Sequence, residues 1–201
     1  MAEHDDYIRA SYAAHIEAVS SDAMMAAESI HQLAECLART LLNGGKIICC
    51  SDDHGSGLAQ IMASALAFGH YGARPDLPAI AITPTGLGRM SNRAADTNEL
   101  FARQIKLLGN SNDRLMVFCT AESAPVTLIN AVLSAADCGI PLSLARGSQE
   151  NRIDALLQDS DTCIALSSKN YNRLLESNIV LINLLCELVE QQIFGTEITP
   201  Q

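Results

Sequence analysis

One short stretch, residues 46–57, constrains the fold of this chain more than any other. An apolar-rich run at 46–50 lies between the turn sequence Asn-Gly-Gly (43–45) and a cluster of Ser, Asp, His and Gly (51–57). Such a run is typical of a fully buried strand in a parallel sheet. The sequence from residue 58 onward is too long and too apolar for another strand and predicts a helix. The carboxyl end of a strand that faces a helix N-terminus is the usual ligand position in folds of this kind.

Apolar runs that suit strands alternate with amphipathic stretches that suit helices along the rest of the chain. We expect strands at residues 46–50, 77–82, 114–120, 141–145 and 162–166. We expect helices at residues 58–70, 98–108, 124–136, 153–157 and 171–194, and a loop at 84–95. Strands and helices at this spacing predict an α/β fold, a three-layer αβα sandwich with a five-stranded parallel sheet.

The first 42 residues read as helical, because apolar residues recur every three or four positions from Tyr7 to Leu42. The Ser-Ser-Asp cluster at 20–22 predicts a break and a helix N-cap. Helices that precede the first strand cannot act as crossovers, so they pack on the sheet or on another subunit, and we favour a subunit interface. We therefore expect a single domain over residues 1–201, with an oligomerisation segment at 1–42 and an αβα core at 43–201.

Charge and cysteine usage exclude several classes of function. The net charge of −10 leaves no basic stripe for a phosphate backbone, so we expect no direct nucleic-acid binding. The seven cysteines fall mostly in apolar stretches without a CxxC motif or a secretory signal, which indicates reduced core residues in a cytoplasmic protein. The apolar run at 179–186 is far shorter than the ~20 residues of a membrane span, so we expect no membrane insertion.

Three stretches, at residues 42–47, 74–82 and 173–194, resemble the sugar-isomerase (SIS) domain proteins of the phosphoheptose isomerase type. Within that family, the paired cysteines at 49 and 50 and the ending at 185–194 resemble the branch that binds the bacterial replication initiator DnaA. The resemblance implies the αβα fold, N-terminal helices that help to build a homotetramer, and a site for a phosphosugar.

The family binds phosphate at the turn after the first strand, G-N-G-G-S or G-N-G-T-S, through backbone N–H groups and a serine hydroxyl. The matching residues here are Ser51, Asp52, Asp53, His54 and Gly55. Two carboxylates at that position would repel a phosphate, which favours a solvated acidic turn that binds none. If the turn is displaced by one residue, Gly55, Ser56 and Gly57 could still donate to a phosphate.

The second phosphate segment of the family, S-T-S-G-N-S after strand three, matches residues 119–124. Only Thr120 keeps a hydroxyl in place, Ser123 lies one position from the family's last serine, and Glu122 adds a carboxylate. The resemblance therefore implies a degenerate phosphosugar site. Its members are Ser51, Asp52, His54, Gly55, Ser56, Thr120, Glu122 and Ser123.

The residues that carry the isomerase reaction in the family are replaced in this chain. The family's His and Glu in the first crossover helix match Ile61 and Ala65, and its Gln and His in the last helix match Leu175 and Asn183. None of these side chains can act as a base or bind zinc, and mostly apolar replacements suggest that the site has become core. We expect no catalytic residue, no metal and no cofactor, and we interpret Arg173 and Glu176 as a helix-surface pair.

Three further features each leave two interpretations open. The run Asp52-Asp53-His54 could hold a metal, but consecutive residues rarely converge on one ion, so an exposed polar turn is favoured. Cys119, where a strand meets a helix, could be a reactive thiol or, as we favour, a buried one. The pair Ile193 and Phe194, before Gly195 at a helix end, could be an exposed partner-binding surface or could pack against a neighbouring subunit.

These observations predict a non-catalytic binding or scaffold protein, a homo-oligomer, expected to be a tetramer, that associates with DnaA and regulates the initiation of DNA replication. The alternatives are a phosphoheptose isomerase that acts on sedoheptulose 7-phosphate through displaced residues, and a phosphosugar sensor whose occupancy changes its affinity for a partner.

Overall fold

The computed structural model describes residues 2–69, 74–83 and 97–195, so the expected loop at 84–95 lies outside the described residues. Five parallel strands form one sheet in the order β2-β1-β3-β4-β5. They are β1 (Ile47–Ser51), β2 (Ala79–Ala81), β3 (Arg114–Cys119), β4 (Leu142–Arg146) and β5 (Thr162–Ala165). This sheet confirms the predicted α/β fold with five parallel strands.

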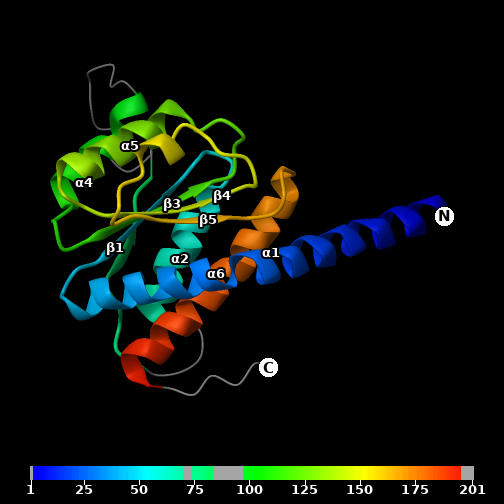
Figure 1. The fold of residues 1–201 in the computed structure, drawn as a ribbon, viewed down its shortest axis with the longest axis horizontal. Helices are drawn as coiled ribbons and strands as arrows, with labels where there is room; N and C mark the ends of the chain where they lie inside the picture. Colours follow the sequence, from blue (N-terminus) through cyan, green and yellow to red (C-terminus); the bar gives the residue numbers. More distant parts are fainter. Residues whose placement is uncertain (1, 70–73, 84–96, 196–201) are drawn as a thin grey trace.

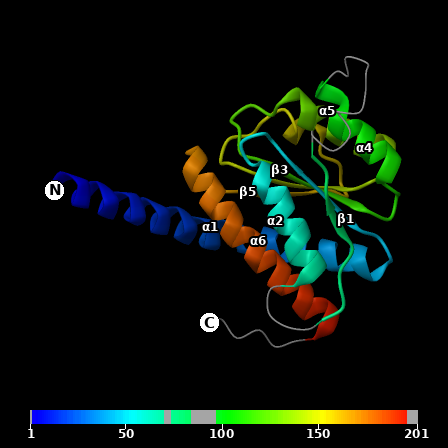
Figure 2. The ribbon, with the colours of Figure 1, turned by 180° about the vertical axis from the view of Figure 1, so that it is seen from behind.

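Helices cover both faces of the sheet (Figure 1). One face carries α1 (Ala2–Leu42), α2 (Ser56–Phe68) and α6 (Tyr171–Phe194), and the other carries α4 (Leu100–Leu108) and α5 (Val126–Asp137). Seen from behind, α2 and α6 lie side by side on the first face (Figure 2), in agreement with their contacts. None of the helices in the described ranges is long and apolar enough to cross a membrane.

Successive side chains of the central strands contribute alternately to two hydrophobic cores, one on each face of the sheet. In β1, Ile47 and Cys49 join the core under α1, α2 and α6, while Ile48 and Cys50 join the core under α4 and α5. Successive side chains of a strand point to opposite faces, so a strand buried on both faces is apolar at most positions. This requirement explains why the apolar runs located the strands.

Two predicted elements are shorter than the sequence suggested. The second strand was expected at 77–82 but pairs only over Ala79–Ala81, at the sheet edge after Pro78, which has no N–H to donate. The helix expected at 153–157 is a single 3₁₀ turn, η2 (Asp154–Leu156). A second 3₁₀ turn, η1 (Thr97–Glu99), leads into α4.

The break predicted at residues 20–22 is wrong, because α1 runs without interruption for 41 residues. Asp22 is buried instead of capping a new helix, and its Oδ1 accepts a hydrogen bond of 2.6 Å from the backbone N–H of Ser167. Serine and aspartate cost a helix only several tenths of a kcal/mol each relative to alanine. Packing against α6 and β5 outweighs that cost.

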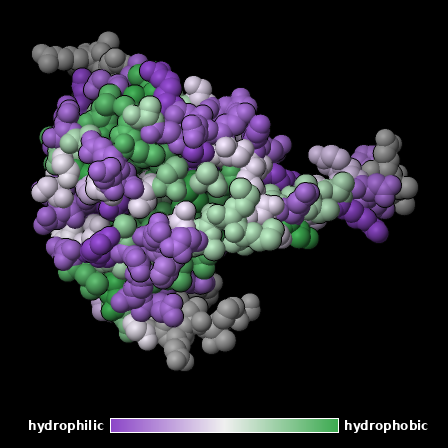
Figure 3. All heavy atoms as spheres, viewed as in Figure 1, coloured by the Kyte–Doolittle hydropathy of each residue, from purple (hydrophilic) through white to green (hydrophobic). Residues whose placement is uncertain are grey.

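The two halves of α1 have different surroundings. Residues 26–41 bury their apolar face against the sheet and α6. The N-terminal half extends away from the body (Figure 1) and exposes large side chains, with weakly apolar residues along the arm in Figure 3. The exposed side chains are Tyr7, Ile8, Tyr12, Ile16, Met24 and Met25. One half of the helix thus packs on its own sheet, and the other half carries an exposed apolar stripe.

Leu37 and Leu42 offer a matched test of this packing. Leu37 is fully buried and Leu42 is 65% exposed on the same helix. We expect Leu37→Ala to lower the free energy of unfolding by about 2–5 kcal/mol, because it removes buried methyl groups and leaves a cavity. Leu42→Ala should change it by less than about 0.5 kcal/mol. Urea denaturation measures both, and equal effects would contradict the described burial.

Candidate functional site

The side chain of Asp52 lies between the turns that follow the two central strands. Ser51 is the last residue of β1 and pairs with Phe118 of β3, so both turns begin at the same edge of the sheet. The Asp52 backbone N–H donates to the carbonyl of Phe118 at 3.2 Å. Only 3% of Asp52 is exposed, and its carboxylate therefore points into the protein.

Four donors converge on that carboxylate. The backbone N–H groups of Thr120 and Ala121 donate to Oδ2 at 2.5 and 2.9 Å. The Thr120 hydroxyl and the backbone N–H of Gly55 donate to Oδ1, each at 2.8 Å. Hydrogen bonds to an ionised acceptor are about twice as strong as neutral ones, so this set offsets the cost of burying the charge. Asp52 thus joins the two turns, and we call the Asp52 carboxylate with its donors on Gly55, Thr120 and Ala121 the Asp52 clasp.

Gly55 is needed where the first turn enters helix α2. A Cβ atom at this position would lie 3.1 Å from Asp52 Oδ1 and 3.2 Å from Thr120 Cγ2, closer than side chains normally pack. Gly55 is also the N-cap residue of α2 and makes no side-chain capping bond. The negative charge of Asp52 at this helix N-terminus is favourable, because the unpaired N–H groups there carry partial positive charge.

The expectation of a solvated acidic turn is therefore wrong for Asp52, although Asp53 is exposed. The two carboxylates do not face the same position: Asp53 is exposed to solvent, and Asp52 is itself the anion that the donors of the two turns bind. A local signal was present, because an Asp three residues before a Gly at a helix start suits a side-chain bond to that backbone N–H.

The structure brings only part of the predicted phosphosugar site together. Asp52, Gly55 and Thr120 meet, and Ser51 is buried at the end of β1. The others are exposed at the surface: His54, Ser56, Glu122 and Ser123.

Tyr171, which the sequence did not single out, contacts His54 above the turns. Its ring meets that of His54 edge to face at 5.2 Å, and its hydroxyl donates to the His54 carbonyl at 2.9 Å. Tyr171 is the first residue of α6. This contact joins the first turn to the start of the last helix.

A small hollow adjoins the Asp52 clasp. It is lined by Thr120, Ala121, Glu122, Gly147, Ser148, Gln149, Lys169 and Leu174. Its volume of about 10 Å³ is about enough for a single water molecule, whereas small-molecule sites usually measure about 300 Å³ or more. This hollow by itself is therefore far too small for a phosphosugar.

The positions that match the isomerase residues are not all core, contrary to the expectation. Ala65 is buried and Leu175 packs half-buried against the core, but Ile61 is 37% exposed. Ile61 and Ala65 line an open groove of about 440 Å³ with Phe68 of α2. The groove is also lined by Gln60, Ser64 and Gly69, and none of its lining side chains is a carboxylate or an imidazole that could act as a base near neutral pH.

Arg173 and Glu176 do more than pair on a helix surface. They form an ion pair, and Glu176 Oε2 also lies 2.8 Å from Nδ1 of His15. The Arg173 guanidinium donates to the hydroxyl of Ser11 at 2.8 Å. The pair therefore ties the start of α6 to the exposed half of α1.

No three His, Cys, Asp or Glu side chains in the described part of the chain are placed to share a metal ion. The two oxygens of Asp52 accept hydrogen bonds from N–H and O–H donors, which a cation could not replace. His54 packs against Tyr171 instead of turning toward Asp52.

The thiol of Cys119 is held in its neutral form. Cys119 is the last residue of β3 and is buried. Burial, followed by the nearby charge of Asp52, raises its pKa from 9.0 to about 12. The same two causes raise the pKa of Cys50. A reactive thiolate needs a lowered pKa, so the geometry supports the buried-thiol interpretation.

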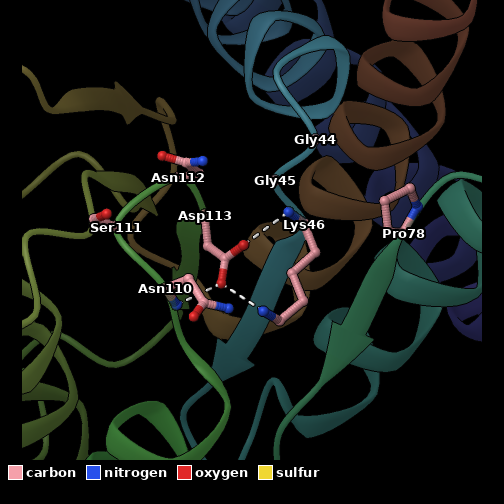
Figure 4. Close-up of a pocket in the computed structure, with 8 residues that line it drawn as sticks. All are labelled: Gly44, Gly45, Lys46, Pro78, Asn110, Ser111, Asn112 and Asp113. Carbon is pink, nitrogen blue, oxygen red and sulfur yellow. Dashed lines mark hydrogen bonds and ion pairs between the residues drawn. The ribbon is translucent and has the colours of Figure 1, made fainter.

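A larger hollow, of about 400 Å³, lies at the opposite, amino edge of the sheet (Figure 4). Asp113 accepts there from the Lys46 ammonium at 2.5 Å, the Lys46 backbone N–H at 2.9 Å and the Asn110 backbone N–H at 2.7 Å. This pairing neutralises Lys46 and fixes the starts of β1 and β3. The sequence placed Lys46 in the first strand but did not point to its pairing with Asp113, which holds the sheet together at its amino edge.

The pair Ile193 and Phe194 is half-buried at the end of α6 and packs against the core that α1, α2 and α6 share. The helix ends at Gly195, whose φ of 68° lies in the left-handed region that favours glycine. The partly exposed faces of the pair leave both interpretations of this end open.

Comparison with known proteins places these features in context. A model of the SIS domain matches residues 11–142. A phosphoheptose isomerase of Methylococcus capsulatus is 31% identical over 190 residues, which cover 94% of this chain and 96% of that protein. A DnaA initiator-associating protein of Klebsiella pneumoniae subsp. pneumoniae is 27% identical over 192 residues, with the same two coverages. The structure of a phosphoheptose isomerase from Francisella tularensis matches with a TM-score of 0.81 and 25% identity, covering 92% of this chain and 97% of that one.

The clasp predicts a large difference between two neighbouring acidic residues. We expect Asp52→Ser to lower the free energy of unfolding by about 2–4 kcal/mol, because buried N–H donors lose a charged acceptor. Asp53→Ser, one position further along and exposed, should leave the urea denaturation midpoint unchanged. Similar midpoints for both variants would show that the carboxylate of Asp52 does not hold the turns.

The thiols predict a pattern of chemical labelling. At pH 8 in the folded protein, iodoacetamide should modify the half-buried Cys36 and Cys138 well before Cys119. All seven cysteines should react in urea, which serves as the control. Labelling of Cys119 as fast as that of Cys36 would contradict the buried-thiol assignment.

The raised pKa of Cys119 also predicts a dependence of stability on pH. Because the folded state keeps Cys119 protonated while the unfolded thiol ionises, the free energy of unfolding should fall as the pH rises from 9 toward about 12.

Proposed function

Since this chain belongs to the SIS-domain family, we propose that it is a non-catalytic member that binds several copies of a protein partner. The Asp52 carboxylate of the chain itself accepts the hydrogen bonds of the N–H donors between the turns after β1 and β3. The observation that carries the proposal is the Asp52 clasp. The side chains at the positions of the family's catalytic residues, Ile61, Ala65, Leu175 and Asn183, support it, because none of them can act as a base.

The partner in this proposal is the replication initiator DnaA, and the process is the regulation of replication initiation in the cytoplasm. The Klebsiella relative is a DnaA initiator-associating protein and aligns with this chain over 94% of its length. The net charge of −10 suits a protein partner with basic surfaces and does not suit direct contact with DNA. The partner surface includes the partly exposed Ile193 and Phe194 at the end of α6.

Assembly is the second part of the proposal. The exposed apolar stripe on the N-terminal half of α1, residues 7–25, suits contact with other copies of the chain, and residues 1–42 are proposed to form the oligomerisation segment of a tetramer. Several identical partner surfaces on one symmetric particle would bring initiator molecules close together. Linked sites raise the effective concentration of the next partner and can increase avidity by about 10²–10⁴ without a new contact.

Binding of purified DnaA to the purified oligomer tests the partner. We expect the parent protein to bind and the double variant Ile193→Ala/Phe194→Ala to bind at least about tenfold more weakly, which corresponds to about 1.4 kcal/mol. The matched control is Leu107→Ala/Leu108→Ala, an exposed apolar pair at the end of α4. Urea denaturation of both variants separates a binding defect from unfolding.

Two results would overturn the partner assignment. If the folded parent oligomer does not bind DnaA, the initiator is not its partner. If the Leu107/Leu108 variant loses binding while the Ile193/Phe194 variant keeps it, the partner surface lies on α4 instead of α6.

The second candidate is an isomerase, which is favoured by the 31% identity with the Methylococcus phosphoheptose isomerase. It requires turnover of sedoheptulose 7-phosphate, with loss of that turnover in Glu122→Gln or His54→Ala. The related sensor hypothesis requires a phosphosugar to raise the melting temperature, and Thr120→Val should abolish the rise. We expect neither turnover nor a rise with the folded parent protein. Turnover would displace the non-catalytic proposal, and a rise without turnover would favour the sensor hypothesis.

A further inference from the structure

A short segment, residues 167–176, holds the N-terminal half of α1 through polar contacts. We call these residues the linking segment and that half of α1 the α1 arm. The linking segment consists of the loop after β5 and the start of α6. The backbone N–H of Ser167 donates to Asp22 at 2.6 Å, and the Ser167 hydroxyl donates to the carbonyl of Ala18 at 3.3 Å. Only 7% of Asp22 is exposed, so this part of the attachment is buried.

The linking segment also contacts the part of the arm that extends away from the body (Figure 1). Arg173 donates to the hydroxyl of Ser11, and Glu176, the ion-pair partner of Arg173, lies 2.8 Å from Nδ1 of His15. One exposed ion pair contributes little, but the Arg173 side chain is only 18% exposed and bonds to groups on both helices. The attachment follows one face of α1, because its positions recur every three or four residues: 11, 15, 18 and 22.

The same segment holds the turn after β1. The Tyr171 hydroxyl donates to the carbonyl of His54 at 2.9 Å, and the two rings meet edge to face, a favourable geometry for aromatic pairs. His54 precedes Gly55, whose N–H donates to the carboxylate of Asp52. The linking segment is therefore in direct contact with the α1 arm and with the turn that contains the Asp52 clasp.

The two sets of contacts share one rigid turn of helix. The Asn170 side chain caps α6, because it accepts from the backbone N–H groups of Asn172 and Arg173 at 3.0 and 3.3 Å. Tyr171, which holds the turn after β1, and Arg173, which holds the arm, both lie in this capped turn. A displacement on one side of the linking segment therefore moves the groups that bind on the other side.

We propose that the linking segment couples the α1 arm to the turn at residues 52–55, so that order in one is gained or lost with order in the other. Contact of the arm with a second copy of this chain then reduces the local opening of the turn. Such coupling acts equally in both directions. Only the second copy rests on the proposed assembly. The coupling itself lies within one chain and is measured without a partner protein, so the two proposals can fail separately.

Hydrogen–deuterium exchange, read by mass spectrometry on the isolated protein, tests the coupling. The double variant Ser11→Ala/His15→Ala removes contacts of the arm and leaves the linking segment unchanged. We expect peptides over residues 52–58 to exchange at least about fivefold faster in this variant, because the turn opens more often. The matched control is His31→Ala, which removes an exposed ion pair with Glu35 on the same helix and should leave these peptides unchanged.

The reverse direction is tested from the turn. His54→Ala removes the ring contact with Tyr171 and also leaves the linking segment unchanged. Peptides over residues 8–18 should exchange faster in this variant than in Asp53→Ser, its exposed neighbour, because the coupling is reciprocal. This variant carries the test alone if the double variant does not fold.

Three results would overturn the proposal. The first is faster exchange that stays within α1 in Ser11→Ala/His15→Ala. The second is an equal increase in the peptides of the central strand β3, because the loss of order would then be global. The third is the same exchange of residues 8–18 in His54→Ala and in Asp53→Ser.

Discussion

The hydrogen bonds of the Asp52 carboxylate are the interaction on which the carboxyl edge of the sheet depends. The carboxylate joins the turn after β1 to the turn after β3 through hydrogen bonds of 2.5–2.9 Å, and both strands lie at the centre of the sheet. A buried charge is tolerable only when donors surround it, so the two turns and the start of α2 must stay together for the fold to be stable. The same charge helps to keep the thiols of Cys50 and Cys119 protonated.

The layout of the fold could be predicted from the sequence because the strands are buried on both faces. Apolar runs bounded by turn residues located all five strands, and the 3.6-residue period located α6 at residues 171–194. The errors arose where tertiary contacts override local preference. Residues 20–22 stay helical because Asp22 bonds to Ser167, and β2 pairs over only three residues because it is a sheet edge beside Pro78.

The candidate site was predictable only in part, for a related reason. Parallel strands end at one edge, so the sequence placed the turns containing Asp52 and Thr120 near each other. The bond from the Gly55 N–H to Asp52 has a local signal in the sequence. The other donors include the N–H groups of Thr120 and Ala121, far along the chain, and no local pattern gives their direction. Tyr171 and Lys169 were missed because they reach the edge from the segment that precedes and begins α6.

The family supplies a fold, and function depends on what each member does with its sites. In this member, the Asp52 side chain accepts the hydrogen bonds of the donors at the carboxyl edge of the sheet. The side chains at the family's catalytic positions include Ile61, which lines an open groove on α2. Among the described residues, the apolar stripe of α1 is exposed and the end of α6 is partly exposed. This distribution is the basis on which we propose binding between proteins instead of chemistry on a sugar.

The most direct measurement is a crystal structure of the parent protein grown in a phosphate-containing solution. The account predicts that the Asp52 carboxylate lies within hydrogen-bond distance of the N–H groups of Thr120 and Ala121, with no phosphate between the two turns. A phosphate seated between the turns, with the Asp52 side chain displaced to solvent, would contradict it.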